Sequence, residues 1–467
     1  MFLCYYIRRN LPGDGSIFTI GMPKNLAVRK EIRKSLRYSM MEVSSASAMV
    51  GFSEQYVGPY AIAMNANNTQ IGLLSSIPSL AASLFQLKAA DITARQGSRK
   101  KVLTVSVFFH SLMWVPVMLI PFLFKGDALR SNILIALFVI YAVLGSLGAP
   151  AYGSLMADYI HERMRGKYLG WRGGVSGIIV TVSSFAAGFI LHVFTKNIFV
   201  GFSIIFGVAI IARLFSWYFL TKLYDTPLVI KKEHYFSFWD FIKRYRESNF
   251  AKFVVYVSCI TFSANLAGPF FAVYMLRELK FSYLEYTIIT ITATIASILT
   301  MRYWGKQADR VGNIKILVIS SLMVPFIPML WLISQNIFFL IIVNIIGGYA
   351  WAGFNLCAGN FILDSAIPEK RARCVAYFNV INGTALCIGA LSGSFLSTRL
   401  PSISGSKLLT LFLISGLVRA LFVAVLLPRI KEVRKVKDVR TRDLFYSVTG
   451  LKPLIDTTRE GLRIFRE

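Results

Sequence analysis

The sequence is short of the residues that soluble proteins and enzymes use most. Only 16% of its 467 residues are charged, whereas soluble chains average about 25%. It has four histidines and five cysteines, with no CxxC pair and no HExxH motif. It also has no glycine-rich loop of the kind that ends in Lys and binds nucleotides. We therefore expect no metal, no other cofactor, no catalytic residues and no ATP-driven pump; the chain is not expected to be an enzyme.

What the chain has instead is apolar sequence in long blocks. Hydrophobic residues make up 55% of it, and the mean hydropathy is +0.58. The blocks are about 20 residues long, which is the length that a helix needs to cross the hydrocarbon core of a membrane. Helices satisfy their own backbone groups there. The sequence predicts twelve, over residues 39–63, 69–90, 101–123, 132–158, 168–194, 198–221, 251–276, 283–304, 314–334, 337–362, 374–398 and 407–428.

The basic residues follow the predicted alternation of these helices. The net charge is +28, which would fit a nucleic-acid-binding protein if the charges clustered in a soluble domain. With the N-terminus inside, however, 42 Lys and Arg fall in inner segments and seven in outer loops. Membrane proteins keep basic residues on the cytoplasmic side. The pattern therefore predicts a multi-pass protein of the cell membrane with both termini cytoplasmic and no nucleic-acid partner.

A basic stretch divides the predicted helices six and six. Together with the basic tail, it is expected to contact anionic lipid at the inner surface. The start of the chain is a separate question. Met22 is an alternative first residue, in which case residues 1–21 would be an artefact of the assigned start. The expected parts are a cytoplasmic N-terminal tail 1–38, a six-helix bundle 39–222, a cytoplasmic linker 223–249, a second six-helix bundle 250–428 and a basic cytoplasmic tail 429–467.

A charged loop motif occurs once in each half of the chain. The clearer copy, between the eighth and ninth predicted helices, reads GKQADRVGNIK over residues 305–315. A looser copy, between the second and third, reads ADITARQGSRKK over residues 90–101. Asp91 and Asp309 are 218 residues apart. This spacing indicates an internal repeat.

A second pair of motifs has nearly the same spacing. The fourth predicted helix ends in LMADYIHERMRGK, which contains Asp158, and the tenth ends in FILDSAIPEKRAR, which contains Asp364, 206 residues later. Parallel six-helix repeats are typical of transporters. Together these motifs resemble those of the major facilitator superfamily, in which a G-x-x-x-D-R-x-G-x-x-K loop follows the second helix of each half.

The resemblance implies both a fold and a function. The fold would be all-α and integral to the membrane, with twelve transmembrane helices in two six-helix pseudo-repeat bundles. The function would be secondary active transport of a small solute by alternating access, with proton coupling as one option. The family's usual state is a monomer in membrane lipid. A channel or a receptor-like sensor on the same fold remains the alternative.

The resemblance also implies that the charged motif residues form a gate on the inner side. In the family, such clusters hold the inner side shut in one state and part in the other. An Asp at a helix end beside an Arg in a short loop can form the required charge-assisted pairs. The alternative is that these residues only fix topology and loop packing. The gating residues would be Asp91, Arg95, Arg99, Asp158, Asp309, Arg310 and Asp364.

Ionisable and polar residues at membrane depth are the candidates for binding, because a charge in hydrocarbon costs several kcal/mol. Glu54, in the first predicted helix, is the main candidate for a proton or a polar substrate group, with Gln55 or Tyr56 beside it. The alternative is that Glu54 only hydrogen-bonds into the helix packing. His110, Asn265 and Asn355 are further candidates, although a polar residue of this kind at membrane depth more often makes a packing hydrogen bond than a substrate contact.

Two further arginines, Arg213 and Arg419, lie in helices expected to face lipid. We expect both side chains to extend toward the membrane surface; the alternative for Arg213 is contact with an anionic substrate. A helix break beside Asn265 is expected at Gly268-Pro269, since breaks are tolerated where the backbone lines a cavity.

Overall fold

The computed structural model describes residues 26–160, 162–226, 248–365 and 371–432. These residues form helices and no named strand. In the first half they are α2 (Leu26–Phe52) with η2 (Glu54–Tyr56) and α3 (Val57–Ala63), α4 (Asn68–Gln96), α5 (Arg99–Leu112) with α6 (Trp114–Leu123), α7 (Asp127–Tyr159), α8 (Glu162–Val193), η3 (Thr195–Asn197) and α9 (Ile198–Thr221).

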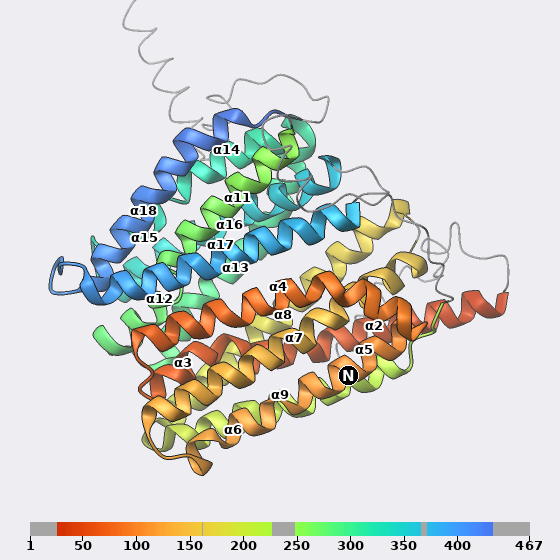
Figure 1. Ribbon diagram of the computed structural model, residues 1–467, viewed down its shortest axis with the longest axis horizontal. Coiled ribbons are helices and arrows are strands. Elements are labelled where there is room, and N and C mark those ends of the chain that lie inside the picture. The colour runs from red at the N-terminus through yellow and green to blue at the C-terminus, as the bar shows by residue number, and fades with distance from the viewer. Residues whose placement is uncertain (1–25, 161, 227–247, 366–370, 433–467) are drawn as a thin grey trace, which may run out of the picture.

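The second half repeats this arrangement. Its elements are α11 (Asn249–Ala267) with α12 (Phe270–Val273) and η5 (Tyr274–Glu278), α13 (Tyr283–Val311), α14 (Asn313–Met323) with α15 (Phe326–Leu330), α16 (Ile337–Ser365), α17 (Arg371–Arg399), and α18 (Lys407–Leu426) with η6 (Leu427–Arg429). The first half, red to yellow, and the second half, green to blue, lie against each other as two bundles (Figure 1). The predicted twelve-helix, two-bundle fold is confirmed.

Eleven helical segments of the described chain are long and apolar enough to cross a membrane. The remaining crossing is the first, α2 to α3, which contains Glu42, Glu54 and several serines. It begins at Leu26, earlier than the predicted residue 39, because the basic stretch before the apolar block also favours helix. The expected break at Gly268-Pro269 is confirmed, since α11 ends just before it and α12 begins just after.

The two ends of the bundle differ in how the halves meet. We call the end that carries Lys222 and Asn249 the linker end, and the end that carries Ala66 and Ser397 the far end. One buried apolar cluster contains residues of both halves, among them Tyr56 and Ile289. The two other buried clusters belong to one half each. The shared cluster includes the far-end residues, whereas the separate clusters include the helix ends at the linker end.

Most of the described hydrogen bonds between the halves also lie toward the far end. At the far end, Asn68 donates to Ser397 over 3.2 Å, and Arg277 donates to the carbonyl oxygen of Ala66. Nearer the linker end, Asn379 donates to Gln86 over 3.1 Å. The described contacts thus close the far end, where a continuous apolar core also joins the halves.

Helix contacts in the second half depend on glycines that have no room for a side chain. A Cβ atom on Gly393 of α17 would lie 2.1 Å from the carbonyl oxygen of Leu266 on α11. We expect Gly393→Ala to force the two helices apart and sharply reduce the yield of folded protein. Gly359 is the control, because a Cβ there meets no atom within 4 Å. Size-exclusion profiles should be normal for Gly359→Ala and aggregated for Gly393→Ala; equal profiles would contradict this packing.

Candidate functional site

A cavity of about 490 Å³ lies between the two halves. Its lining comes from the η2–α3 segment, α4 and α7 in the first half and from the α11–α12 break and α13 in the second. Glu54 lies nine residues before the end of α3, so the cavity is roughly 14 Å from the far end of that helix. The volume lies within the range of small-molecule sites, about 300–1,000 Å³.

The break in the first crossing places Glu54 in this cavity. The regular helix ends at Phe52, and one turn of 3₁₀ helix carries Glu54 and Gln55. Both side chains are exposed and line the cavity. Glu54 is the only charged residue among those described in the lining. The arrangement gives the cavity a single carboxylate in otherwise neutral surroundings.

A group of packed aromatic side chains fixes the position of this carboxylate. The hydroxyl group of Tyr141, on α7, donates a hydrogen bond to Glu54. His110, on α5, stacks on the Tyr141 ring with centroids 3.8 Å apart, and Trp114 meets the same ring edge-on at 5.2 Å. Tyr141 and His110 are 6% and 5% exposed. The Glu54 carboxylate is therefore fixed by a packed aromatic group while facing open space.

The other predicted binding residues lie in different places. Tyr56 is not among the described lining residues of the large cavity; its hydroxyl group bonds the carbonyl oxygen of Ser184 and the Thr287 hydroxyl, the latter over 2.8 Å. Asn265 donates to a carbonyl oxygen of its own helix over 2.9 Å. Asn355 is exposed on α16. The predicted binding residues that line the large cavity are thus Glu54 and Gln55.

In each half, one residue of the charged loop motif contacts the aspartate at the end of the fourth helix. Arg99, at the start of α5, forms an ion pair of 2.6 Å with Asp158 at the end of α7. It also donates to Ser154 over 2.7 Å. In the second half Asn313, at the start of α14, donates to Asp364 over 2.7 Å. The two aspartates that the repeat placed 206 residues apart therefore have equivalent partners within their own halves.

The remaining motif residues lie at the same end. Asp91 and Arg95 are on the last turns of α4, where Arg95 is exposed and the Asp91 side chain lies outside what the structure describes. Asp309 and Arg310 are exposed on the last turn of α13. Gly312, next in the motif, has φ of +96°, a backbone conformation that favours glycine. Gating by these residues stays a prediction.

Two carboxylates at the linker end escaped the sequence analysis. Ser98, which caps α5, donates to Asp225 over 2.5 Å. In the second half the backbone N–H of Ile314, in the first turn of α14, donates to Glu432 over 2.8 Å. Each carboxylate follows the sixth helix of its half and lies at the N-terminus of the third, where negative charge is favourable. These two carboxylates are 207 residues apart, close to the spacing of the other repeated motifs, and this spacing could have identified them from the sequence.

A buried ion pair was also missed. Arg172 of α8 donates to Glu42 of α2 over 2.8 Å and stacks over the Tyr152 ring at 4.7 Å. Ser216 donates to the second oxygen of Glu42 over 3.3 Å, and Arg213 donates to Ser216 over 3.3 Å. Glu42 is 6% exposed. No sequence pattern indicated this pairing, because the partners come from helices 130 and more residues apart.

Arg419 does not extend toward the membrane surface, so that expectation was wrong. Its side chain is 3% exposed and lies inside the second bundle. It donates to the carbonyl oxygen of Val324 over 3.2 Å and to that of Ala264 over 3.4 Å. The Val324 carbonyl has no usual helical partner, because residue 328 is a proline. The Ala264 carbonyl also accepts from the N–H of Gly268, where α11 ends. The arginine therefore stabilises helix breaks rather than contacting lipid.

Comparisons with known proteins agree with this geometry. The profile of the Major Facilitator Superfamily matches residues 43–249 and 253–458. The chain therefore belongs to this family of membrane transporters. A search of curated proteins finds no match.

Solved structures show the same fold. The nucleoside transporter NupG, in a crystal structure of a point mutant, aligns with a TM-score of 0.67 and 14% identity over 85% of this chain and all of the other. The xylose transporter XylE from E. coli, in a partially occluded inward-open conformation, aligns with a TM-score of 0.60, 11% identity, and 88% and 99% coverage. An inward-facing bacterial homologue of the human lysosomal transporter Spinster aligns with a TM-score of 0.58 and 13% identity over 87% of this chain and 96% of the other.

Proposed function

We propose that the protein is a secondary active transporter that moves a small solute by alternating access, with the central cavity as its binding site. The main support is the division of the apolar core, which is shared by the halves at the far end and separate at the linker end. Two bundles joined in this way can rock about a site between them. The Gly268-Pro269 break at the cavity wall is a suitable hinge.

The proposed orientation places the linker end in the cytoplasm of a cell with the protein in its plasma membrane. Basic residues gather in the segments at this end, as cytoplasmic segments of membrane proteins do. The described state is then closed to the outside. The Arg99–Asp158 and Asn313–Asp364 pairs lie on the cytoplasmic side, where we propose that they steady the helix ends that separate and meet during the cycle.

The cavity lining limits the substrate. It offers one carboxylate, one amide, serine and tyrosine hydroxyl groups, and apolar surface that includes Phe138 and three prolines, one each on α3, α4 and the hinge. An anionic solute would meet Glu54 with no described basic residue in the lining to offset it. A neutral or positively charged solute with hydrogen-bond donors and an apolar part fits this lining better.

We propose Glu54 as the coupling residue. A carboxylate at membrane depth that faces a cavity can bind a proton or a cationic group. Binding neutralises the charge and so removes the free-energy cost of keeping it inside the membrane. Exchange of the proton with substrate would link the two movements. A channel or a sensor on this fold is the second candidate, and the closed far end favours a carrier, because a channel needs a continuous path in one state.

The experiment is a thermal-stability screen of the purified chain against a broad solute library at two pH values. Ligands stabilise the state that binds them by mass action. We expect cationic or neutral amphipathic compounds to raise the unfolding temperature of the wild type, and Glu54→Gln to weaken the response and remove its pH dependence. Stabilisation by anionic solutes alone would contradict the proposed site.

A further inference from the structure

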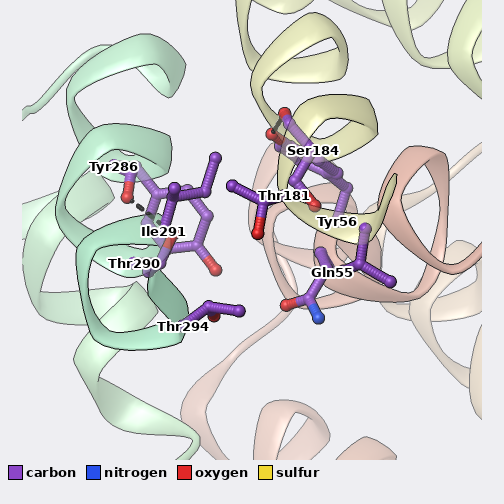
Figure 2. A pocket seen from close by; sticks show the side chains of 9 residues that line it. Gln55, Tyr56, Thr181, Ser184, Tyr286, Thr290, Ile291 and Thr294 are labelled. Carbon is purple, nitrogen blue, oxygen red and sulfur yellow. Dashed lines mark hydrogen bonds between the residues drawn. The ribbon is translucent and has the colours of Figure 1, made fainter. Parts of the chain in front are cut away.

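A second, smaller space lies beside the central cavity. It measures about 20 Å³ and lies between α8 of the first half and α13 of the second. Gln55 and Tyr286 line both spaces, so the small one adjoins the large one. Figure 2 shows Gln55 and Thr181 on one side facing Tyr286, Thr290 and Thr294 on the other. We call this space the interfacial niche.

Oxygen atoms with free lone pairs surround the niche. Thr181 donates its proton to the carbonyl oxygen of Gly177 over 2.8 Å, and Thr290 donates to that of Tyr286 over 2.9 Å. With their protons engaged, both hydroxyl oxygens can only accept a further bond or coordinate a cation. Thr294 lies one helical turn beyond Thr290, so it shares the same face of α13.

Ser184 supplies an independent sign that the niche takes a ligand. Its side chain is 5% exposed and lines the niche. Its hydroxyl oxygen is buried and has no hydrogen-bond partner among the described residues. Leaving such a group unsatisfied costs about 1–3 kcal/mol. Native proteins rarely keep such groups, so a bound species is expected to contact this oxygen.

The size and charge of the niche limit that species. The volume of 20 Å³ is close to that needed by one water molecule or one ion, about 10–15 Å³. No Asp, Glu, Lys or Arg is among its described lining residues. A neutral set of hard oxygen ligands leaves a divalent cation uncompensated, whereas one positive charge is tolerable when Glu54 is adjacent in sequence to Gln55.

We propose that the interfacial niche binds a single Na⁺ ion. Its ligands come from both halves: Thr181 and Ser184 from α8, and Thr290 and Thr294 from α13. Coupling-ion sites in secondary transporters lie near the middle of the membrane at the interface between repeats. The niche occupies such a place, beside the proposed substrate cavity but distinct from it.

Close helix packing keeps these ligands together in the described state. A Cβ atom on Gly188 would lie 2.3 Å from the Thr287 hydroxyl oxygen, and one on Gly177 would lie 2.7 Å from Ile298. Both contacts join α8 to α13, one on each side of the niche residues in sequence. Separation of the two helices would pull the ligand set apart. Bound Na⁺ must therefore favour the state in which the far end is closed.

The test measures the thermal stability of the full-length purified chain in Na⁺, K⁺ or N-methylglucamine chloride at equal ionic strength, without any transport substrate. We expect Na⁺ to raise the apparent unfolding midpoint by about 3 °C over the other two cations. Thr290→Val and Ser184→Ala should abolish this difference. Thr292→Val is the matched control, because Thr292 lies on the same helix, bonds its own backbone over 2.6 Å and does not line the niche.

A second readout follows the conformation. Ser397, which bonds Asn68 at the closed far end, is replaced by Cys and labelled with a membrane-impermeant maleimide in vesicles. Na⁺ should slow labelling several-fold, and Thr290→Val should remove that protection. Equal midpoints and equal labelling in all three salts would show that the niche holds only water, and would overturn the proposal. Neither result depends on transport, so the proposed function is tested separately.

Discussion

Replacement of Glu54 by Gln is expected to reduce uptake driven by a proton gradient by at least about tenfold, a loss of roughly 1.4 kcal/mol or more in the coupled step. Glutamine keeps the size of the side chain and can still accept the Tyr141 hydrogen bond. It cannot bind a proton or carry the negative charge. Initial rates in proteoliposomes with an imposed pH gradient measure this effect.

Tyr141→Phe is the matched control for that result. It removes the hydroxyl group that donates to Glu54 but leaves the carboxylate and the ring that stacks on His110. We expect coupling to survive, because the carboxylate that would bind the proton is still present. The assignment of Glu54 would fail if Glu54→Gln kept the wild-type rate and the wild-type pH dependence.

Arg172→Met is expected to destabilise the first bundle by about 3 kcal/mol, because it leaves the Glu42 carboxylate buried without its counter-charge. Glu42 is 6% exposed, so water cannot replace the lost partner. The Ser216 hydroxyl group still donates to Glu42 over 3.3 Å, but Arg213 reaches this carboxylate only through Ser216 in the described hydrogen bonds. Thermal unfolding in detergent, followed through tryptophan fluorescence, measures the loss.

The double variant Glu42→Gln, Arg172→Met separates the two causes that such a loss could have. If the loss comes from an uncompensated charge, the double variant should regain most of the stability, since neutral groups of similar size replace both ions. If it comes from lost packing against Tyr152, which lies 4.7 Å from the guanidinium group, the double variant should be no better than the single one. The first outcome is expected.

The fold could be predicted because its signals are local and repeated. Apolar blocks indicated the helices, and the alternation of basic segments indicated their number. The aspartates of the repeat, Asp158 and Asp364, were found from two similar motifs and their spacing, and the structure gives them equivalent partners. Such patterns need no knowledge of which helices touch.

The candidate site could be predicted only in part, since it depends on contacts between distant helices. Glu54 was conspicuous as a charge in an apolar block, but Tyr141, which holds it, lies 87 residues away and carries no sequence motif. Asn265 drew attention as a polar residue at membrane depth, yet its amide bonds its own helix. Arg419 was predicted to extend to the membrane surface but is buried. The backbone oxygens that it contacts come from breaks in two other helices, which its own sequence could not indicate.

Substrate counterflow in proteoliposomes tests the central claim most directly. Vesicles loaded with an unlabelled compound from the stability screen are diluted into labelled compound, with no ion gradient. A carrier that alternates between two states should concentrate the label inside transiently, because exchange is faster than net movement. The account predicts this overshoot in the wild type and in Glu54→Gln, whose exchange needs no proton. Simple equilibration without overshoot would indicate a channel, and no entry of label would indicate a sensor; either result would contradict alternating access.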